Sequence, residues 1–252
     1  MLTHPTLEKL QTMRLTGMAK AFEEQLQMAD IEALCAEERI GLMVDRERLE
    51  RDNRRLTTRL RNAKLRHNGV VEDIDYRHPR GLDRVLMTKL ATSAWLREHL
   101  NCLIVGPTGI GKSWLGCALA QKACRDGFSA LYVRAPRFFR ELSIAKGDGR
   151  YPKLMRTLAK TDLLVLDDFG AAPLTDEHRR DLLELFDDRY GALSTLVTSQ
   201  YPLEHWHELI GDPTLADAIL DRLVHNAYKI NLKGESMRKR RKQLTQTGQE
   251  NS

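Results

Sequence analysis

The fold of this chain is decided by the stretch Gly106-Pro107-Thr108-Gly109-Ile110-Gly111-Lys112-Ser113, which fits the pattern Gly-x-x-x-x-Gly-Lys-[Ser/Thr]. The apolar run Cys102–Val105 precedes it, and a helix-like run from Trp114 to Ala120 follows it. A strand, a glycine-rich loop and a helix in this order form a phosphate-binding loop. Backbone N–H groups of the loop and the positive end of the helix would face the phosphates of a nucleotide.

The residue types within this loop indicate how a nucleotide would be held. Lys112 is expected to reach the β- and γ-phosphates, and the Ser113 hydroxyl is expected to coordinate Mg²⁺. The sequence therefore predicts an ATP and Mg²⁺ site. The predicted nucleotide-binding residues are Gly106, Pro107, Thr108, Gly109, Ile110, Gly111, Lys112, Ser113 and Trp114.

Composition indicates a globular protein with a polyanionic partner. The 252 residues are 42% hydrophobic, which is enough for one sizeable core and a smaller domain. The net charge of +5 is unevenly spread: residues 39–66 contain ten Arg or Lys residues against four acids, and residues 238–242 are Arg-Lys-Arg-Arg-Lys. Such clusters favour DNA or an acidic partner.

Cysteine usage and hydropathy predict a compartment. Cys35, Cys102, Cys117 and Cys124 contain no Cys-x-x-Cys pair, so neither a zinc site nor a disulfide framework is indicated. No apolar run approaches the ~18 residues that a membrane span needs, and the N-terminus lacks the hydrophobic region of a signal peptide. We expect a soluble, cytoplasmic protein without a membrane partner.

The chain is expected to contain four parts. Residues 1–66 have helical spacing, and Leu42, Leu49, Leu56 and Leu60 mark a long helix with many arginines. Those arginines could pair with Glu47, Glu50 and Asp52 on a solvated face, but the excess of positive charge favours DNA or an acidic partner. The DNA-contacting candidates here are Arg54, Arg55, Arg59 and Arg61. The turn signals Asn68-Gly69 and Pro79 predict a linker over 67–80, followed by an ATPase domain over 81–237 and a basic tail over 238–252.

After residue 80, short apolar runs alternate with helical patterns. This alternation predicts an α/β fold with a parallel sheet flanked by helices, because parallel strands need crossover helices. Both faces of such a sheet are covered, so its strands should be continuously apolar. The expected strands are Cys102–Val105, Ala130–Val133, Leu163–Leu166, Thr195–Thr198 and Tyr228–Leu232.

Two acids, Asp167 and Asp168, follow the third expected strand, at the edge where open α/β sheets bind ligands. Asp167 is placed to hold Mg²⁺, and Asp168 to orient and polarise an attacking water. The same pair could merely cap the next helix, but together with the upstream glycine loop it favours catalysis.

Two further residues have open interpretations. Gln200 follows the next expected strand and would lie beside the two acids, where it could sense the γ-phosphate or the water, or simply begin a polar loop. Arg222 lies on a helical stretch and could be an ordinary salt-bridge partner of Asp221 or Asp217.

The motifs together resemble the AAA+ superfamily, and within it closely resemble the IstB-type transposition helper ATPases; the DnaC helicase loaders are a less close match. The resemblance covers nearly the whole chain. It rests on Leu-Val-Leu-Asp-Asp-Phe-Gly at 164–170, Asp-Arg-Tyr-Gly at 188–191, Thr-Ser-Gln-Tyr-Pro at 198–202, Gly-Asp-Pro-Thr-Leu-Ala-Asp-Ala-Ile-Leu-Asp-Arg-Leu-Val-His at 211–225 and Gly-Glu-Ser-Met-Arg at 234–238, in addition to the glycine loop.

The resemblance implies roles for three residues. Gln200 stands at the sensor I position, and Arg222 at the arginine finger that enters a neighbouring subunit's site. Arg238 becomes a candidate sensor II that contacts the nucleotide in its own subunit, although it begins a basic run that could bind DNA instead. Most AAA+ proteins have Glu where this chain has Asp168, and the shorter side chain suits slow hydrolysis.

The segment 134–160 contains eight Arg or Lys residues and two acids. The resemblance implies a helical insertion here that faces DNA in the centre of an assembly; the alternative is a solvated helix pair. The DNA-contacting candidates of this segment are Lys146, Arg150, Lys153 and Arg156.

The expected protein is an ATPase that oligomerises as a ring or helix on duplex DNA, selects or remodels the target and stimulates a transposase. Two rival functions are a DnaC-like helicase loader and an ATP-dependent scaffold with little turnover. A transposase gene beside this one would argue against the loader, and a turnover assay would test the scaffold.

Overall fold

The computed structural model describes residues 4–237, and the chain divides into two compact units, Met1–Thr58 and Arg59–Ser252. The predicted α/β class is confirmed: the second unit contains a five-stranded parallel sheet in the order β2-β3-β4-β1-β5. The strands are β1 (Asn101–Val105), β2 (Ala130–Arg134), β3 (Leu163–Phe169), β4 (Ser194–Ser199) and β5 (Ala227–Asn231).

The first unit consists of α1 (Pro5–Thr12), α2 (Thr16–Gln27), the 3-10 turn η1 (Ile31–Ala33) and most of α3 (Ala36–Ala63). Leu7, Leu10 and Ala19 form its small core. The Glu47 carboxylate of α3 accepts hydrogen bonds from the Gly17 and Met18 N–H groups at the first turn of α2. This carboxylate caps α2, whose own N-cap residue, Leu15, supplies no side-chain hydrogen bond.

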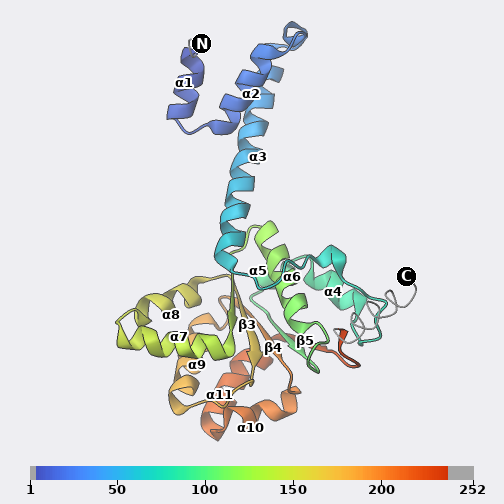
Figure 1. Cartoon of the computed structure of the whole chain (residues 1–252), viewed down its shortest axis with the longest axis vertical. Helices are drawn as coiled ribbons and strands as arrows, with labels where there is room; N and C mark the ends of the chain where they lie inside the picture. Colours follow the sequence, from blue (N-terminus) through green and yellow to red (C-terminus); the bar gives the residue numbers. More distant parts are fainter. Residues whose placement is uncertain (1–3, 238–252) are drawn as a thin grey trace, which may run out of the picture. The chain divides into compact units, whose positions relative to one another are not determined.

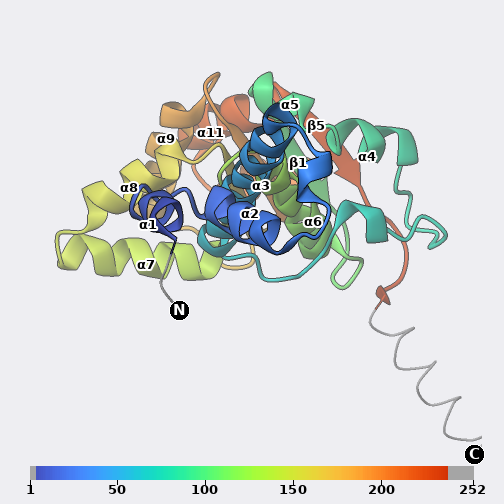
Figure 2. The same cartoon turned by 90° about the horizontal axis from the view of Figure 1, so that it is seen from above.

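Helices cover both faces of the sheet, which explains why its strands are apolar (Figures 1 and 2). On one face, α6 packs across four strands. On the other face, Leu103, Leu166 and Val197 join the core formed by the remaining long helices. The helices of this unit are α4 (Arg84–Leu90), α5 (Ala94–Arg97), α6 (Lys112–Arg125), α7 (Ala135–Gly147), α8 (Tyr151–Lys160), α9 (Asp176–Arg189), α10 (Trp206–Ile210) and α11 (Pro213–Val224), with 3-10 turns at Val71–Asp73 and Leu203–His205.

The third strand is longer than expected and irregular where its two acids stand. Leu166 pairs with Val197 and Phe169 pairs with Ser199, so β3 contains one extra residue in this interval. Asp168 takes a left-handed conformation with φ of 59°. A β-bulge of this kind redirects side chains, and it separates the directions of Asp167 and Asp168.

The segment predicted as a linker makes ordered contacts within the second unit. The Arg80 side chain is 2% exposed and donates from Nη1 to the carbonyl of Ile110 in the glycine loop at 3.1 Å. The four-part domain division proposed from sequence stays a prediction, and its basic tail lies outside the described residues. No helix within residues 4–237 is long and apolar enough to cross a membrane.

Candidate nucleotide-binding site

The glycine loop joins β1 to α6 as the sequence predicts. Gly106 and Gly109 have φ values of 149° and 84°, which L side chains rarely adopt. A Cβ at Gly106 would collide with the Leu232 carbonyl, and one at Gly109 would collide with the Ser236 hydroxyl. The loop is therefore a backbone-lined cradle at the N-terminus of a 14-residue helix, where N–H groups favour anions.

The chain beyond β5 lies along this cradle. Leu232 N–H donates to the carbonyl of Val105 at 2.8 Å, and Met237 N–H donates to the carbonyl of Gly109 at 3.0 Å. The motif at 234–237 thus packs on the phosphate loop, a placement that sequence reasoning did not predict. Arg238, the candidate sensor II, follows directly but lies outside the described residues.

Lys112 begins α6 and points back to the loop. Its Nζ donates to the carbonyls of Gly106 at 2.6 Å and Pro107 at 3.0 Å, which holds the ammonium against the glycine loop. Burial lowers the pKa of Lys112, and the charges of Asp168 and Asp167 oppose this change. Ser113 follows Lys112 in the chain, and both residues line an open pocket beside the glycine loop.

Asp167 is fully buried between two hydroxyl groups. Tyr132 from β2 donates to its Oδ2, and Thr198 from β4 donates to its Oδ1. Arg66 Nη1 lies 4.0 Å from Oδ2. Burial and the bond to Asp167 raise the pKa of the Tyr132 hydroxyl, so the hydroxyl remains a donor at neutral pH. These contacts hold the Asp167 carboxylate in place at the end of β3. Carboxylate oxygens are among the ligands that Mg²⁺ prefers.

Asp168 turns away from Asp167 and lines the open pocket. Its backbone N–H donates to Thr198 Oγ1 at 3.2 Å, so one threonine stabilises both sides of the bulge. Its carboxylate accepts from Arg134 Nε at 2.6 Å. The predicted water-orienting group is therefore paired with a cation from the end of β2 in this structure.

The structure brings most of the predicted site together. Gln200 accepts a hydrogen bond from Thr108 Oγ1 at 3.1 Å, which places it against the glycine loop. One open pocket of about 1330 Å³ is lined by Thr108, Gly109, Gly111, Lys112, Ser113, Trp114, Asp168 and Gln200 among others. Because the sheet is parallel, these groups meet at the C-terminal edge of β1, β3 and β4.

The same pocket has buried polar nitrogens without a partner in the described part of the chain. Arg80 Nε and His78 Nδ1 are buried and have no hydrogen-bond partner among residues 4–237, and both residues line the pocket. Burial lowers the pKa of the Arg80 guanidinium. Orphaned polar atoms beside an anion-binding cradle fit a polar ligand such as a nucleotide. Sequence reasoning missed Arg66, Arg80, Tyr132 and Arg134, whose only signal was their residue type.

Arg222 lies far from this pocket. Asn101, the first residue of β1, donates from Nδ2 to the Arg222 carbonyl at 3.0 Å, whereas the glycine loop follows the other end of the same strand. A five-residue strand spans ~15 Å. The Arg222 guanidinium pairs with Asp187 of α9 rather than with Asp217 or Asp221, and its side chain is 28% exposed.

Arg189 of the family motif at 188–191 has a structural role. It is 1% exposed and donates to the carbonyls of Leu158, Thr161 and Ser194 and to the Thr195 hydroxyl. Burial lowers the pKa of Arg189 to about 10. This arginine ties α8, α9 and β4 together and does not reach the pocket.

The DNA-contacting candidates of α3 differ in their surroundings. Arg54 donates to Thr16 Oγ1 at 2.7 Å, and Arg55 lies 3.8 Å from Asp52. Arg59 Nε donates to the carbonyl of Cys124 at 2.8 Å. Arg61 is exposed and has no hydrogen-bond or ion-pair partner among residues 4–237.

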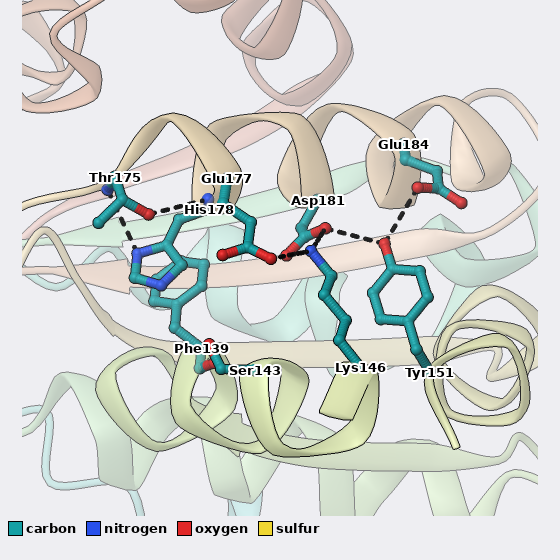
Figure 3. Close-up of polar contacts among 9 residues, drawn as sticks. All are labelled: Phe139, Ser143, Lys146, Tyr151, Thr175, Glu177, His178, Asp181 and Glu184. Atoms are coloured by element: carbon teal, nitrogen blue, oxygen red, sulfur yellow. Dashed lines mark hydrogen bonds and ion pairs between the residues drawn. The ribbon is translucent and has the colours of Figure 1, made fainter. Parts of the chain in front are cut away.

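The candidates of the 134–160 segment lie on α7 and α8 or between them. Lys146 Nζ is held by Glu177 at 2.8 Å and Asp181 at 2.7 Å, and Asp181 also accepts from Tyr151 (Figure 3). Arg150 pairs with Asp148. The exposed pair Lys153 and Arg156 has no partner within the described part of the chain.

The fold and the pocket define a P-loop domain of the AAA+ fold. Solved structures with this fold include the DnaC helicase loader, with a TM-score of 0.56 at 21% identity, which covers 68% of this chain and 100% of that chain. The replication initiator DnaA bound to AMPPCP and single-stranded DNA also has a TM-score of 0.56, at 17% identity, covering 68% of this chain and 52% of that chain. At such identities the likeness shows the fold alone.

Sequence comparison gives the particular family. The model of the IstB-like ATP binding protein family matches residues 8–245, so the chain belongs to this family. It is 57% identical to y4pL of Sinorhizobium fredii, a protein named for an insertion sequence and for ATP binding, over 95% of this chain and 98% of the relative. It is 31% identical to the protein of the same description from insertion sequence IS21 of Pseudomonas aeruginosa, over 92% and 88%. The predicted family is confirmed.

Proposed function

We propose that this protein is a Mg²⁺-dependent ATPase that assembles on duplex DNA and stimulates a partner transposase during insertion-sequence transposition. The observation that carries the ATPase part is the meeting of Lys112, Asp168 and Gln200 at one pocket beside a glycine cradle. The relatives' names connect such chains with insertion sequences, which favours a transposase over a replicative helicase as the client.

Each residue of the pocket has a definite task in this proposal. Lys112 neutralises the β- and γ-phosphates, and Ser113 and Asp167 would hold the metal ion. When bound, Mg²⁺ withdraws charge from the phosphate oxygens. Asp168 accepts a hydrogen bond from the attacking water, once its carboxylate is no longer held by Arg134, and Gln200 contacts the same water or the γ-phosphate.

The ATPase proposal is tested by separating binding from turnover. Lys112→Ala should abolish ATP binding because the phosphates lose their main counter-charge. Asp168→Asn should retain ATP affinity and lose turnover by roughly 10²–10⁴-fold, because the amide is a poor base. Nucleotide affinity and phosphate release, measured with and without DNA, check both variants. Full hydrolysis by Asp168→Asn would remove this role from Asp168, and a wild type that binds ATP without turnover would be a scaffold.

The assembly proposal rests on the position of Arg222. Its backbone lies beside the start of β1, at the end of the strand opposite the subunit's own glycine loop, which supports a role at another subunit's nucleotide rather than at its own. An arginine supplied in trans is worth roughly 10³–10⁵ in rate in other systems. Arg222→Ala should therefore lose turnover while it retains ATP binding.

Mixing two inactive variants gives the decisive measurement. An Arg222→Ala subunit has an intact glycine loop and can receive Arg222 from a Lys112→Ala neighbour, so activity should partly return on DNA. Mixtures that co-assemble yet remain inactive would contradict action in trans. The transposase proposal is tested by adding the chain to a purified insertion-sequence transposase: strand transfer should rise with ATP and fail to rise with Lys112→Ala.

A further inference from the structure

The buried carboxylate of Asp167 has one ion-pair partner among residues 4–237, and it comes from outside the recognised motifs. Asp167 is 0% exposed, and a carboxylate at such depth is stabilised by nearby positive charge. Arg66 Nη1 lies 4.0 Å from Oδ2, while Lys112 and Arg134 act on Asp167 through their charges without an ion pair. The Arg66 side chain is 41% exposed and lines the nucleotide pocket together with Lys112 and Asp168.

The backbone beside Arg66 is held firmly. α3 ends at Ala63, which is fully buried, and Lys64 reverses the chain with φ of 51°. Gly69 then packs so closely on α6 that a Cβ there would lie 2.9 Å from Trp114 Cε2. A long side chain on this fixed connection can change partners within the pocket while its backbone stays in place.

We propose that Arg66 is a γ-phosphate-binding residue that leaves Asp167 when ATP binds. This inference rests on the proposed ATP site. A metal ion held by Asp167 and the Arg66 guanidinium are like charges that compete for one carboxylate, and the γ-phosphate offers the guanidinium a stronger anionic partner. ADP lacks that phosphate, so Arg66 distinguishes ATP from ADP within its own subunit.

The movement of Arg66 from Asp167 to the γ-phosphate has a second consequence, which follows from the position of Arg66 in the chain. Arg66 lies three residues beyond the last residue of α3, on the connection between that helix and the phosphate-binding unit. Its change of partner moves a positive charge near the C-terminal end of α3, where the helix dipole favours cations. The nucleotide state is thereby transmitted to the helix that carries the basic segment at 39–66.

The test compares two nucleotides in the full-length chain. Affinities for ADP and for the β,γ-methylene analogue of ATP are measured by calorimetry with Mg²⁺. Arg66→Ala should weaken the analogue by roughly 10- to 100-fold, the range expected for one charge-assisted hydrogen bond, and leave ADP affinity unchanged. Arg66→Lys should restore part of the preference. Lys64→Ala removes an exposed charge two residues away and should alter neither affinity.

Hydrogen exchange gives a second test, because an arginine with only a structural role would not make the exchange rates depend on the nucleotide. Residues 59–66 should exchange differently with the analogue and with ADP in the wild type, and this difference should vanish in Arg66→Ala. Equal weakening of both nucleotides, or an unchanged preference, would overturn the inference. A wild type that binds neither nucleotide would overturn the ATP site itself, so the two failures are distinguishable.

Discussion

The helices α3 and α8 are both strongly basic, yet they use their cations differently. In α3, Arg51 pairs with Glu47, Arg54 donates to Thr16, and Arg59 donates to a carbonyl of α6. In α8, the cations occupy one exposed face opposite the buried Met155 and Leu158 and have no partner among residues 4–237. These cations are Lys153, Arg156 and Lys160.

This difference shows that a count of charges does not measure the charge available to a polyanion. An arginine held by a protein partner has fewer free N–H donors for a phosphate and is less free to move toward it, which reduces the net gain of the contact. The three cations of α8 are exposed, have no hydrogen-bond or ion-pair partner in the described range 4–237, and lie three, four or seven residues apart along one helix face. We therefore expect α8 to contribute more phosphate contacts than the same number of tied arginines in α3.

The largest expected effect is on DNA affinity. The triple variant Lys153→Ala, Arg156→Ala, Lys160→Ala should reduce the slope of log affinity against log salt by ~0.9 for each phosphate that the variant no longer neutralises. Binding should weaken to a similar degree on unrelated duplexes, because phosphate contacts carry no sequence information. A salt titration of DNA binding with ATP present checks this.

Arg54→Ala and Arg59→Ala are the matched comparison in α3. Each variant should reduce the slope of log affinity against log salt by less than the value for one fully neutralised phosphate. The reason is that these two guanidiniums already have protein partners. A triple variant of α8 with an unchanged slope would reverse the comparison and assign the DNA contacts to α3.

A second prediction concerns Lys146 of α7, a cation that is already paired with Glu177 and Asp181. Lys146→Met should leave the salt slope unchanged and destabilise the second unit by about 2–3 kcal/mol, somewhat less than for a fully buried pair. The reason is that Asp181, only 6% exposed, keeps its charge and loses its cation. Arg137→Met, which breaks an exposed pair with Glu141, is the control and should cost below about 1 kcal/mol in urea unfolding. A reduced salt slope in Lys146→Met would show that the ion pairs open on DNA.

The sequence predicted those features that depend on neighbours along the chain. Each expected strand formed, with bounds shifted by up to three residues, because apolar runs flanked by polar turns are local signals. The glycine loop, Asp168 and Gln200 meet as expected, because parallel strands bring their C-terminal ends to one edge.

The rest depends on contacts between distant residues. Tyr132 and Asp167 are 35 positions apart, and Lys146 and Asp181 are also 35 apart, so neither pair has a periodic signal. The bulge at Asp168 could not be predicted, because an extra residue in β3 is visible only against the register of β4. Arg80 fell in a segment whose turn signals indicated only a linker, and Arg66 counted only as the last cation of the basic segment 39–66.

The smallest expected effect concerns the contacts that Glu47 of α3 makes with α2 and Arg51, and it depends on pH. Burial alone would raise the pKa of Glu47, but hydrogen bonds from Arg51, Met18 and Gly17 lower it below its usual value of 4.5. The unfolded state therefore binds more protons than the folded state in this range. The stabilisation is fully present above pH 4.5 and is lost as pH falls through the lower pKa of the folded state.

Glu47→Gln should destabilise α2 by about 1–2 kcal/mol at pH 7, the range for losing a helix N-cap. Below the folded pKa the difference from wild type should shrink, because Glu47 is then protonated in both states. The measurement is a urea series with pulsed hydrogen exchange on peptides from α2, after equilibration at each pH. Glu50→Gln, which breaks a surface pair with Lys20, is the control and should cost below about 1 kcal/mol. A Glu47→Gln cost that does not change between pH 7 and acidic pH would mean that the carboxylate charge contributes nothing to the cap or to the pair with Arg51.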